Sequence, residues 1–319
     1  MSELEILDLS VSFATGGGDL QALNKVTFKV PEHRIVGIVG ESGCGKSTLI
    51  DAILGLLADN GRIDGGEILF EGRDLTKLGA KELREIRGPR ISTVFQDPMG
   101  ALNPVFRVGR QMTNIQYRSG LSKREKARRA AEMLRRVRMP DPEAALSRYP
   151  HEFSGGMKQR IAIAMAMMME PALLIADEPT TALDATLEAA TIDLLLELQN
   201  QIGCSMLYVS HHMGVIAELC DEVVVMYAGE VVERGTTRQV FLKPRHPYTQ
   251  RLIECDPARL AGRAEKLPTI PGDIPDLRAR PSGCVFAARC SLREEVCGEP
   301  PPENVREGHM ARCHRAAEN

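Results

Sequence analysis

The sequence has no long hydrophobic run and no leader-like start. No stretch of about 18 residues, the length that a membrane-spanning helix requires, is both predominantly apolar and uncharged. The longest uncharged window, residues 198–217, contains two Gln, one Asn and two His. The first five residues lack the basic and apolar regions of a secretory signal. We therefore expect a chain that stays in the cytosol, where thiols are usually reduced, and that reaches a membrane only through a partner.

The sequence also lacks an excess of either charge. It has 40 Lys and Arg against 43 Asp and Glu, which gives a formal net charge of −3. This balance excludes a generically basic nucleic-acid-binding protein and an acidic disordered tail. Residues 118–138 are a local exception, with nine Arg or Lys against two Glu. Either a nucleic-acid contact or a solvated helix face fits this run. Small and apolar residues at helical spacing, with no aromatic between residues 123 and 138, favour the solvated face.

The apolar pattern predicts an α/β fold. A length of 319 residues suggests about two domains. Short uninterrupted apolar runs alternate with helical patterns, which is typical of buried strands in a largely parallel sheet. We expect strands at residues 35–39, 91–95, 173–176, 206–209 and 223–227, helices at 47–57, 123–138, 157–169 and 187–201, and a β-rich edge formed by residues 4–13 and 22–30.

Residues 40–47 read Gly-Glu-Ser-Gly-Cys-Gly-Lys-Ser and match the phosphate-loop pattern G-x-x-x-x-G-K-[ST]. Glycines let backbone N–H groups turn inward around phosphates. Lys46 can reach the β- and γ-phosphates, and the Ser47 hydroxyl can bind Mg²⁺. A predicted strand precedes the loop and a predicted helix follows it, so the positive end of the helix dipole would face the phosphates.

Two further motifs lie between residues 150 and 180. Asp177 and Glu178 end an apolar strand, where they could hold Mg²⁺ and polarise an attacking water. Ser154, Gly155 and Gly156 open an apolar helix, where Ser154 can cap the first turn. This helix start could bind a second anion, or it could be an ordinary capped helix with a Met-rich core face.

The order of these motifs gives residues 1–235 a clear resemblance to the nucleotide-binding subunit of ATP-binding cassette (ABC) transporters. The phosphate loop is followed by Gln96, the Ser-Gly-Gly signature, Asp177-Glu178, the Ala-Leu-Asp that ends at Asp184, and His211. The resemblance implies a P-loop NTPase core with a helical subdomain at about residues 97–165.

The resemblance also implies a role for each motif residue. Phe13 would stack on adenine, Gln96 would contact Mg²⁺ and the membrane partner, and Asp184 would link two sites across a dimer. It implies the following catalytic residues: Lys46, Gln96, Glu178 and His211. It implies Ser47, Gln96 and Asp177 at Mg²⁺, and the following residues at ATP: Phe13, Gly40, Ser42, Gly43, Cys44, Gly45, Lys46, Ser47, Thr48, Gln96, Ser154, Gly155, Gly156, Asp177, Asp184 and His211. The signature has Phe153 and Met157 where many family members have Leu and Gln, but its Ser-Gly-Gly core is intact. His212 stands where many members carry Asp, a departure that concerns only secondary contacts.

Residues 236–319 have a different composition and form a predicted small, irregular C-terminal module. They hold ten of the 19 prolines. Residues 243–249, Lys-Pro-Arg-His-Pro-Tyr-Thr, resemble an extension found in the oligopeptide, dipeptide and nickel importers of this family. The tail also holds four of the eight cysteines: Cys284, Cys290, Cys297 and Cys313.

Four thiols in a small module fit one soft-metal centre. Zinc sites favour close C-x₂₋₄-C pairs, which are absent here, whereas wider spacing fits an iron–sulfur cluster held by four thiolates. The resemblance agrees, because several peptide-importer ATPases carry a [4Fe-4S] motif. Zinc, with His309 or His314 as a ligand, and free thiols or disulfides remain alternatives. We expect Cys204, Cys220 and Cys255 to be small buried side chains.

The resemblance therefore predicts an ATPase subunit that uses ATP and Mg²⁺ to drive import of dipeptides, oligopeptides or a related small solute. The expected partners are a second, different ATPase subunit, two membrane permeases and an extracytoplasmic substrate-binding protein, with no nucleic acid. The subunit would lie peripherally on the cytoplasmic face of the inner membrane. The alternative is a non-transport cassette ATPase that acts on nucleic acid or in translation.

Overall fold

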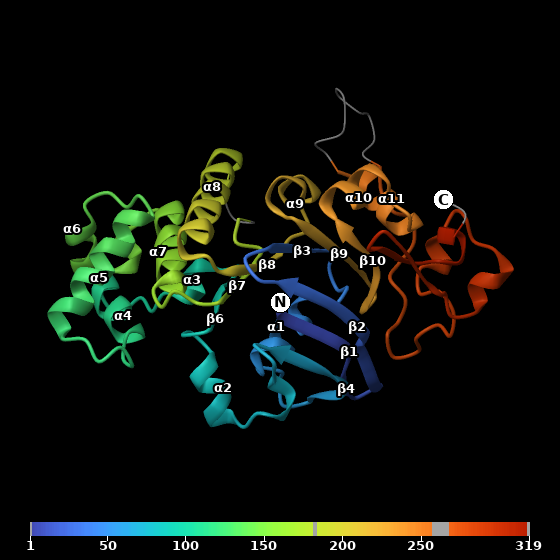
Figure 1. Cartoon of the computed structure of the whole chain (residues 1–319), viewed down its shortest axis with the longest axis horizontal. Helices are drawn as coiled ribbons and strands as arrows, with labels where there is room; N and C mark the ends of the chain where they lie inside the picture. The colour runs from blue at the N-terminus through green and yellow to red at the C-terminus, as the bar shows by residue number, and fades with distance from the viewer. Residues whose placement is uncertain (1, 181–183, 257–267, 318–319) are drawn as a thin grey trace. The chain divides into compact units, whose positions relative to one another are not determined.

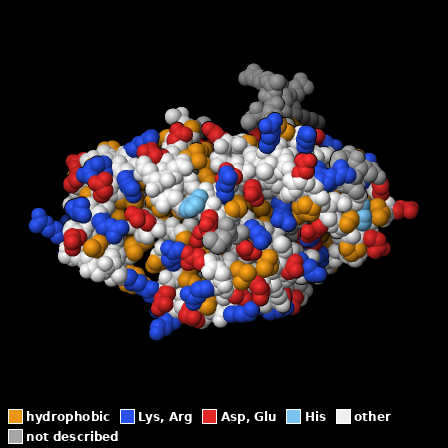
Figure 2. Space-filling view, in the orientation of Figure 1, with side chains coloured by type: hydrophobic (Ala, Val, Ile, Leu, Met, Phe, Trp, Pro, Cys, Tyr) orange, Lys and Arg blue, Asp and Glu red, His pale blue; other side chains and the backbone are white. Residues whose placement is uncertain are grey.

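The computed structural model describes residues 2–180, 184–256 and 268–317 of the chain. The chain divides into two compact units. The first comprises Met1–Leu78 and Tyr208–Asn319, and the second comprises Gly79–Leu207. No helix in the described part of the chain has the length and apolar character needed to cross a membrane. Acidic and basic side chains are interspersed over the face drawn in Figure 2, as expected from the balanced composition.

The first unit contains an antiparallel sheet, drawn in blue in Figure 1. Its strands lie in the order β2-β1-β4-β5, with bounds β1 Ser2–Thr15, β2 Gly18–Pro31, β4 Gly61–Phe70 and β5 Arg73–Asp74. A single 3₁₀ turn, Leu75–Lys77, follows β5. Alternate side chains of β1 and β2 are buried, which is the pattern of a sheet with one face on the core. This sheet is the predicted β-rich edge.

The first unit also contributes five strands to a second sheet, in the order β11-β12-β10-β9-β3. β3 (Ile35–Val39) pairs in parallel with β9 (Glu222–Tyr227), and β10 (Glu230–Thr236) pairs antiparallel with β9. All five residues of β3 are buried, which explains its uninterrupted apolar sequence. β8 (Ser205–Val209) runs through the boundary between the units, and the Ser210 N–H that follows it donates to the Ile38 carbonyl at 3.1 Å. The helices α1 (Lys46–Leu54) and α9 (Met213–Leu219) also belong to this unit.

The C-terminal module contains more regular structure than its sequence suggests. Its described residues include the helices α10 (Thr237–Leu242) and α11 (Pro247–Glu254) and a hairpin of β11 (Glu303–Arg306) and β12 (His309–Arg312). Short 3₁₀ turns lie at Ala287–Arg289, Glu295–Gly298 and His314–Ala317. β12 pairs with β10, so the tail extends the second sheet.

A buried carboxylate fixes this attachment. Glu233 of β10 is fully buried and accepts hydrogen bonds from the backbone N–H groups of Arg245 and His246, at 2.8 and 2.9 Å. His309 Nε2 of β12 lies 2.7 Å from the same carboxylate. A buried charge is stable only when it is paired or fully hydrogen-bonded, so Glu233 ties the tail to the sheet.

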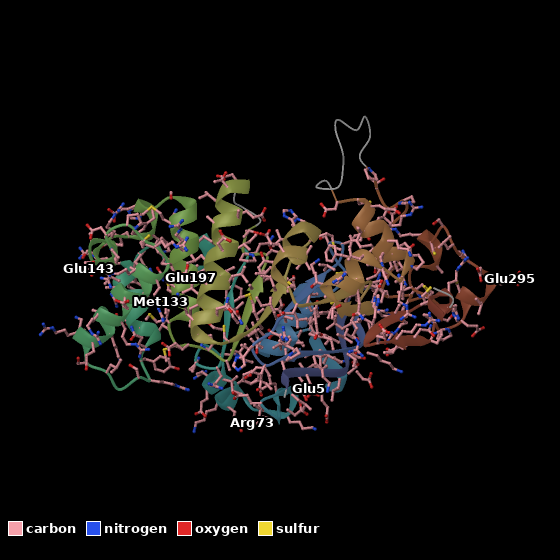
Figure 3. The ribbon with its side chains drawn as sticks, turned by 45° about the horizontal axis from the view of Figure 1, so that its top comes forward. Glu5, Arg73, Met133, Glu143, Glu197 and Glu295 are labelled. Carbon is pink, nitrogen blue, oxygen red and sulfur yellow. The ribbon has the colours of Figure 1, made fainter. Side chains whose placement is uncertain are left out.

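The second unit pairs two parallel strands, β6 (Ile91–Val94) and β7 (Leu173–Asp177). Between them the chain forms helices, drawn in green in Figure 1: α3 Pro98–Ala101, α4 Val108–Ile115, α5 Lys123–Arg136, α6 Pro142–Ser147 and α7 Gly155–Met167, with a 3₁₀ turn at Pro150–Glu152. α2 (Ala80–Ile86) precedes β6, and α8 (Ala185–Ile202) follows β7. The basic run forms α5, whose apolar side is buried and whose Arg135 pairs with Glu143, labelled in Figure 3.

Candidate functional site

The phosphate loop follows β3 and leads into α1 of the first unit. Gly40, Gly43 and Gly45 all have positive φ angles. Gly40 also lies where no side chain fits, because a Cβ there would be 2.2 Å from the Met226 carbonyl oxygen. Gly45 is the residue before α1 and Lys46 is its first residue. The loop therefore has the strand–turn–helix context that directs backbone N–H groups and a helix N-terminus to one place.

The Lys46 side chain lies within this loop. Its side chain is buried, and its Nζ donates to the Gly40 carbonyl at 2.7 Å and the Glu41 carbonyl at 3.2 Å. Cys44 is fully buried nearby, and burial raises the pKa of its thiol while the charge of Lys46 opposes the rise. A protonated, inert thiol fits the view of Cys44 as a tolerated small side chain. Ser42, Gly43 and Ser47 are exposed, and Thr48 is half-buried.

Two other predicted ATP residues belong to the same unit. His211 follows Ser210, whose N–H bonds to Ile38 of β3, so His211 lies beyond the end of the strand next to β3. Its ring is exposed and packs edge-on against His212, with 4.2 Å between ring centroids. Phe13 is half-exposed on β1 and its ring covers Gly61 of β4. The unit thus presents an aromatic, a phosphate loop and a histidine.

The second unit places Gln96 and Glu178 together. Gln96, just after β6, donates from Nε2 to Glu178 Oε2 at 3.1 Å. Asp177 ends β7, and Glu178 follows it with a left-handed φ of 44°. Gln159 of α7 donates to the Pro179 carbonyl at 2.6 Å and holds the chain just beyond these carboxylates. A carboxylate held by a neighbouring amide and by an unusual backbone turn has a defined orientation, as a residue that aligns water requires.

The other two motifs of this unit begin helices. The exposed Ser154 caps α7 through a 3.4 Å hydrogen bond from the Met157 N–H, and Gly155 and Gly156 form its first turn. The Asp184 carboxylate caps α8 by accepting from the N–H groups of Thr186 and Leu187 at 3.1 and 3.0 Å. Residues 181–183, which include the start of the Ala-Leu-Asp motif, lie outside the described residues. The signature therefore presents an exposed hydroxyl and an open helix N-terminus.

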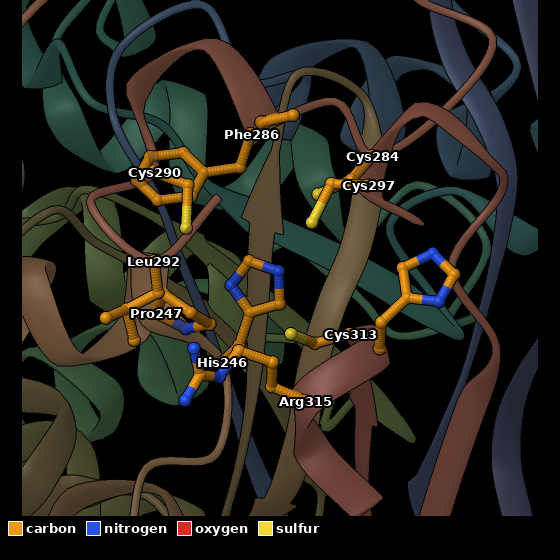
Figure 4. A pocket seen from close by; sticks show the side chains of 11 residues that line it. His246, Pro247, Cys284, Phe286, Cys290, Leu292, Cys297, Cys313 and Arg315 are labelled. Carbon is orange, nitrogen blue, oxygen red and sulfur yellow. The ribbon is translucent and has the colours of Figure 1, made fainter. Parts of the chain in front are cut away.

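The four tail cysteines line one cavity of the first unit. Cys284, Cys290, Cys297 and Cys313 surround the ring of the buried His246, as Figure 4 shows. Gly283 makes this possible, because a Cβ there would lie 2.4 Å from the Cys297 carbonyl oxygen, which accepts the Cys284 N–H at 3.0 Å. The four cysteines, which are spread over 30 positions of the sequence, thus line one cavity.

The cavity is not a formed coordination shell. Over residues 2–180, 184–256 and 268–317, no group of three or more His, Cys, Asp or Glu side chains could hold a metal ion as it stands. Burial raises the pKa of Cys284 to about 11, and the neighbouring thiols add to the rise. Of the other cysteines, Cys204 and Cys220 are buried as predicted, whereas Cys255 is only half-buried.

One set of contacts in the first unit has no counterpart in the sequence patterns. The Arg289 guanidinium pairs with the Glu41 carboxylate of the phosphate loop, and the Tyr248 hydroxyl accepts the Glu41 N–H. Tyr248 lies in the importer-like stretch, but that stretch carries no signal for what the tyrosine contacts. Arg289 and Glu41 are 248 positions apart, which leaves no local spacing to find.

The α/β units and the formed phosphate loop define a P-loop nucleotide-binding protein. Residues 23–181 match the family described as "ABC transporter", and residues 232–297 match "Oligopeptide/dipeptide transporter, C-terminal region". The chain is 46% identical to a probable peptide ABC transporter ATP-binding protein of Sinorhizobium fredii, over 99% of this chain and 95% of the relative. It is 45% identical to the oligopeptide transport ATP-binding protein OppD of Salmonella typhimurium, over 99% and 94% of the two chains.

Solved structures that resemble this chain are also ABC transporter cassettes. A dimeric bacterial ABC transporter cassette, MJ0796, superposes with a TM-score of 0.65 and 28% identity over 74% of this chain and 99% of that cassette. The same cassette bound to ADP and phosphate after hydrolysis gives a TM-score of 0.66. The chain therefore belongs to the ATP-binding proteins of the ABC transporter family. It is an ATPase whose hydrolysis of ATP is coupled to transport, and its partners include a membrane permease and an ATPase subunit.

Proposed function

We propose that this chain powers the import of dipeptides or oligopeptides. The single observation that carries the proposal is the match over the whole chain, tail included, to peptide-transport ATP-binding proteins. We place the nucleotide-binding domain at residues 1–235, with its helical subdomain at about 97–165, and the peptide-importer extension at 236–319.

We propose the following roles for the site residues. Lys46, whose Nζ the Gly40 and Glu41 carbonyls hold within the loop, would contact the β- and γ-phosphates, and the loop N–H groups would share the phosphate charge. Glu178 would align the attacking water, Gln96 would orient Glu178, and His211 would hydrogen-bond the γ-phosphate. Ser47, Asp177 and Gln96 supply the oxygen donors that Mg²⁺ prefers, and the ion would neutralise phosphate charge.

The assembly we propose is that of a binding-protein-dependent importer. The exposed Ser154, at the open N-terminus of α7, would face the phosphate loop of a second, different ATPase subunit. Two permease subunits and an extracytoplasmic substrate-binding protein would complete the transporter. The chain itself would lie on the cytoplasmic face of the inner membrane.

A reconstitution experiment tests the import proposal. The full-length chain is purified with its membrane partners, placed in vesicles, and supplied with ATP, a substrate-binding protein and labelled dipeptides or oligopeptides. We expect ATP-dependent peptide accumulation. Co-purification with ribosomes or nucleic acid in place of permeases, without peptide uptake, would overturn the proposal and favour the non-transport alternative.

We propose further that the tail cysteines hold a [4Fe-4S] cluster. Cys284, Cys290, Cys297 and Cys313 are the four thiol donors that such a cluster requires, and they line one largely apolar cavity. His246 lies in the same cavity, and its Nδ1 accepts the Tyr248 N–H at 3.0 Å, so the proton of the neutral ring is on Nε2. When bound, the cluster would supply iron–thiolate crosslinks between four segments of the tail and a one-electron redox centre.

Anaerobic purification tests the cluster. We expect a brown protein with about four iron and four acid-labile sulfides per chain, and a loss of both when Cys290 and Cys297 are changed to Ser. Cys204→Ser, which alters a buried cysteine outside the cavity, is the matched control. A colourless protein, or one that contains zinc and no sulfide, would refute the cluster.

A further inference from the structure

Glu41, the second residue of the phosphate loop, is held by the C-terminal module through two independent contacts. Its carboxylate receives two hydrogen bonds from Arg289, with NH1 at 2.7 Å from Oε2 and NH2 at 3.0 Å from Oε1. Its backbone N–H donates to the Tyr248 hydroxyl at 2.9 Å. Both contacts lie inside the first unit. The tail therefore binds the phosphate loop at Glu41, through both the side chain and the backbone of this residue.

The side chains of Arg289 and Tyr248 are themselves held by further contacts. Arg289 has only 4% of its side chain exposed, and it also donates to the Ile270 and Pro271 carbonyls at 2.9 Å. The Tyr248 ring is fully buried and packs against Tyr227 and Phe286 with centroid distances of 4.7 and 5.3 Å. A bidentate arginine on a carboxylate fixes orientation as well as position. Thermal motion of the loop at Glu41 is thus restrained by a packed module.

The charge of Glu41 makes this restraint matter for nucleotide. The Glu41 carbonyl lies 3.2 Å from Lys46 Nζ, so the residue borders the ammonium that must meet the phosphates. An unpaired carboxylate at this place would compete with ATP for Lys46 and would repel the triphosphate. Arg289 pairs with this carboxylate through two hydrogen bonds and so offsets its charge. The loop can then present Lys46 to an anion.

We propose that Arg289 and Tyr248 are positioning residues of the ATP site, through which the C-terminal module sets the affinity of the phosphate loop for ATP. Arg289 directly precedes Cys290, and Phe286 lines the cysteine cavity, so the same segment forms the cavity and holds the loop. The inference rests on the ATP site of the proposed function but not on the transported substrate or on the cluster.

Equilibrium ATP binding to the full-length chain tests the charge contact. We expect Arg289→Gln to weaken ATP binding about tenfold, because Glu41 is left unpaired beside Lys46. The double variant Glu41→Gln with Arg289→Gln should recover most of that affinity, because the neutral amide no longer competes. Arg278→Gln is the matched control, since Arg278 makes its side-chain hydrogen bonds to the exposed Asp276 of the same tail.

A purely structural role for Arg289 would give a different pattern. Loss of a buried arginine that only supports folding would lower the midpoint of thermal unfolding, and the double variant would bind ATP no better than Arg289→Gln. That pattern, or unchanged ATP affinity in Arg289→Gln, would overturn the inference. Failure of the wild-type chain to bind ATP would instead overturn the ATPase assignment, so the two failures are distinguishable.

Tyr248→Phe gives a second test that is independent of charge and keeps the packed ring. Hydrogen exchange should show the Glu41 amide exchanging at least about tenfold faster than in the wild type, because its acceptor is gone. ATP binding should weaken severalfold with the cavity intact. An unchanged exchange rate together with unchanged ATP affinity would overturn the role of Tyr248.

Discussion

At the scale of single residues, the most constrained group of the hydrolytic site is Glu178. Its backbone has a left-handed φ of 44°, which residues other than Gly, Asn, Asp and His rarely adopt. Its carboxylate oxygen Oε2 accepts from Gln96, and the Pro179 carbonyl beyond it accepts from Gln159. Strain of this kind persists where the surrounding contacts determine one conformation, and it is often found at functional sites. These contacts thus indicate that the orientation of the Glu178 carboxylate matters for its function.

We predict that Glu178→Gln binds ATP but loses turnover in the assembled transporter. The amide keeps the size of the carboxylate and can still bond to Gln96, but it cannot polarise a water. ATP hydrolysis should fall by about 10²–10⁴-fold, measured as phosphate release. Because ATP is not consumed, the closed ATPase pair should accumulate, which size-exclusion chromatography with ATP would detect. Glu143→Gln, an exposed carboxylate of the same unit, should keep wild-type turnover, and undiminished hydrolysis in Glu178→Gln would contradict the role.

At the scale of helices and strands, the sequence predicts the strands that are buried on both faces. It does not predict contacts between segments that lie far apart in the chain. The strand predicted at residues 35–39 is β3, with the same bounds, because a strand covered on both faces is an uninterrupted apolar run. β11 was not predicted, because its residues Glu303–Arg306 are mostly exposed and polar. The four cysteines could be grouped from their number and spacing. Their cavity around His246 could not, because its walls come from segments about 40–70 residues apart.

His246 makes the stability of α11 sensitive to pH. It precedes the helix, and its Nδ1 accepts the Tyr248 N–H, which caps the first turn. Burial lowers the pKa of His246 from 6.5 to about 4, against a smaller opposing effect of Glu233. Between these two pKa values, His246 is therefore protonated in the unfolded chain and neutral in the folded chain. Stability should fall as the pH falls from about 6.5 to about 4, by up to about 3 kcal/mol.

Urea unfolding at several pH values measures this loss. His246→Asn keeps a capping side chain but has no titrating group, so its unfolding free energy should lack this part of the pH slope. His33→Asn changes an exposed histidine of the same unit and should keep the wild-type slope. Identical slopes in wild type and His246→Asn between pH 6.5 and 4 would show that His246 does not carry the effect.

At the scale of the whole molecule, the predicted ATP residues are divided between the two compact units. Phe13, the phosphate loop and His211 belong to the first unit, whereas the Gln96–Glu178 pair and the signature belong to the second. The signature serine is exposed at the open start of a 13-residue helix, which is a binding arrangement for an anion. In the proposed dimer that anion is the ATP bound by the partner ATPase. Binding and hydrolysis should therefore respond differently to a change at Ser154.

We predict that Ser154→Arg separates these two activities. The long side chain would fill the space over the α7 N-terminus, which in the proposed dimer faces the phosphate loop of the partner ATPase, so ATP affinity of the isolated chain should stay within about twofold. In the assembled transporter, ATPase activity should fall at least about 100-fold, because the opposite γ-phosphate loses a hydroxyl and backbone donors.

Ser122→Arg is the matched control for this prediction. Ser122 is another exposed serine that caps a helix of the second unit, by accepting the Glu125 N–H at 3.3 Å, but it is no part of a predicted ATP contact. Loss of either cap costs about 1 kcal/mol, so the two variants should lose similar stability. Only Ser154→Arg should lose transporter ATPase activity. A different result would contradict the prediction: Ser154→Arg could weaken ATP binding to the isolated chain as strongly as it weakens hydrolysis. The signature would then contact the ATP bound by its own chain, and the proposal that it contacts the ATP of a second ATPase subunit would be wrong.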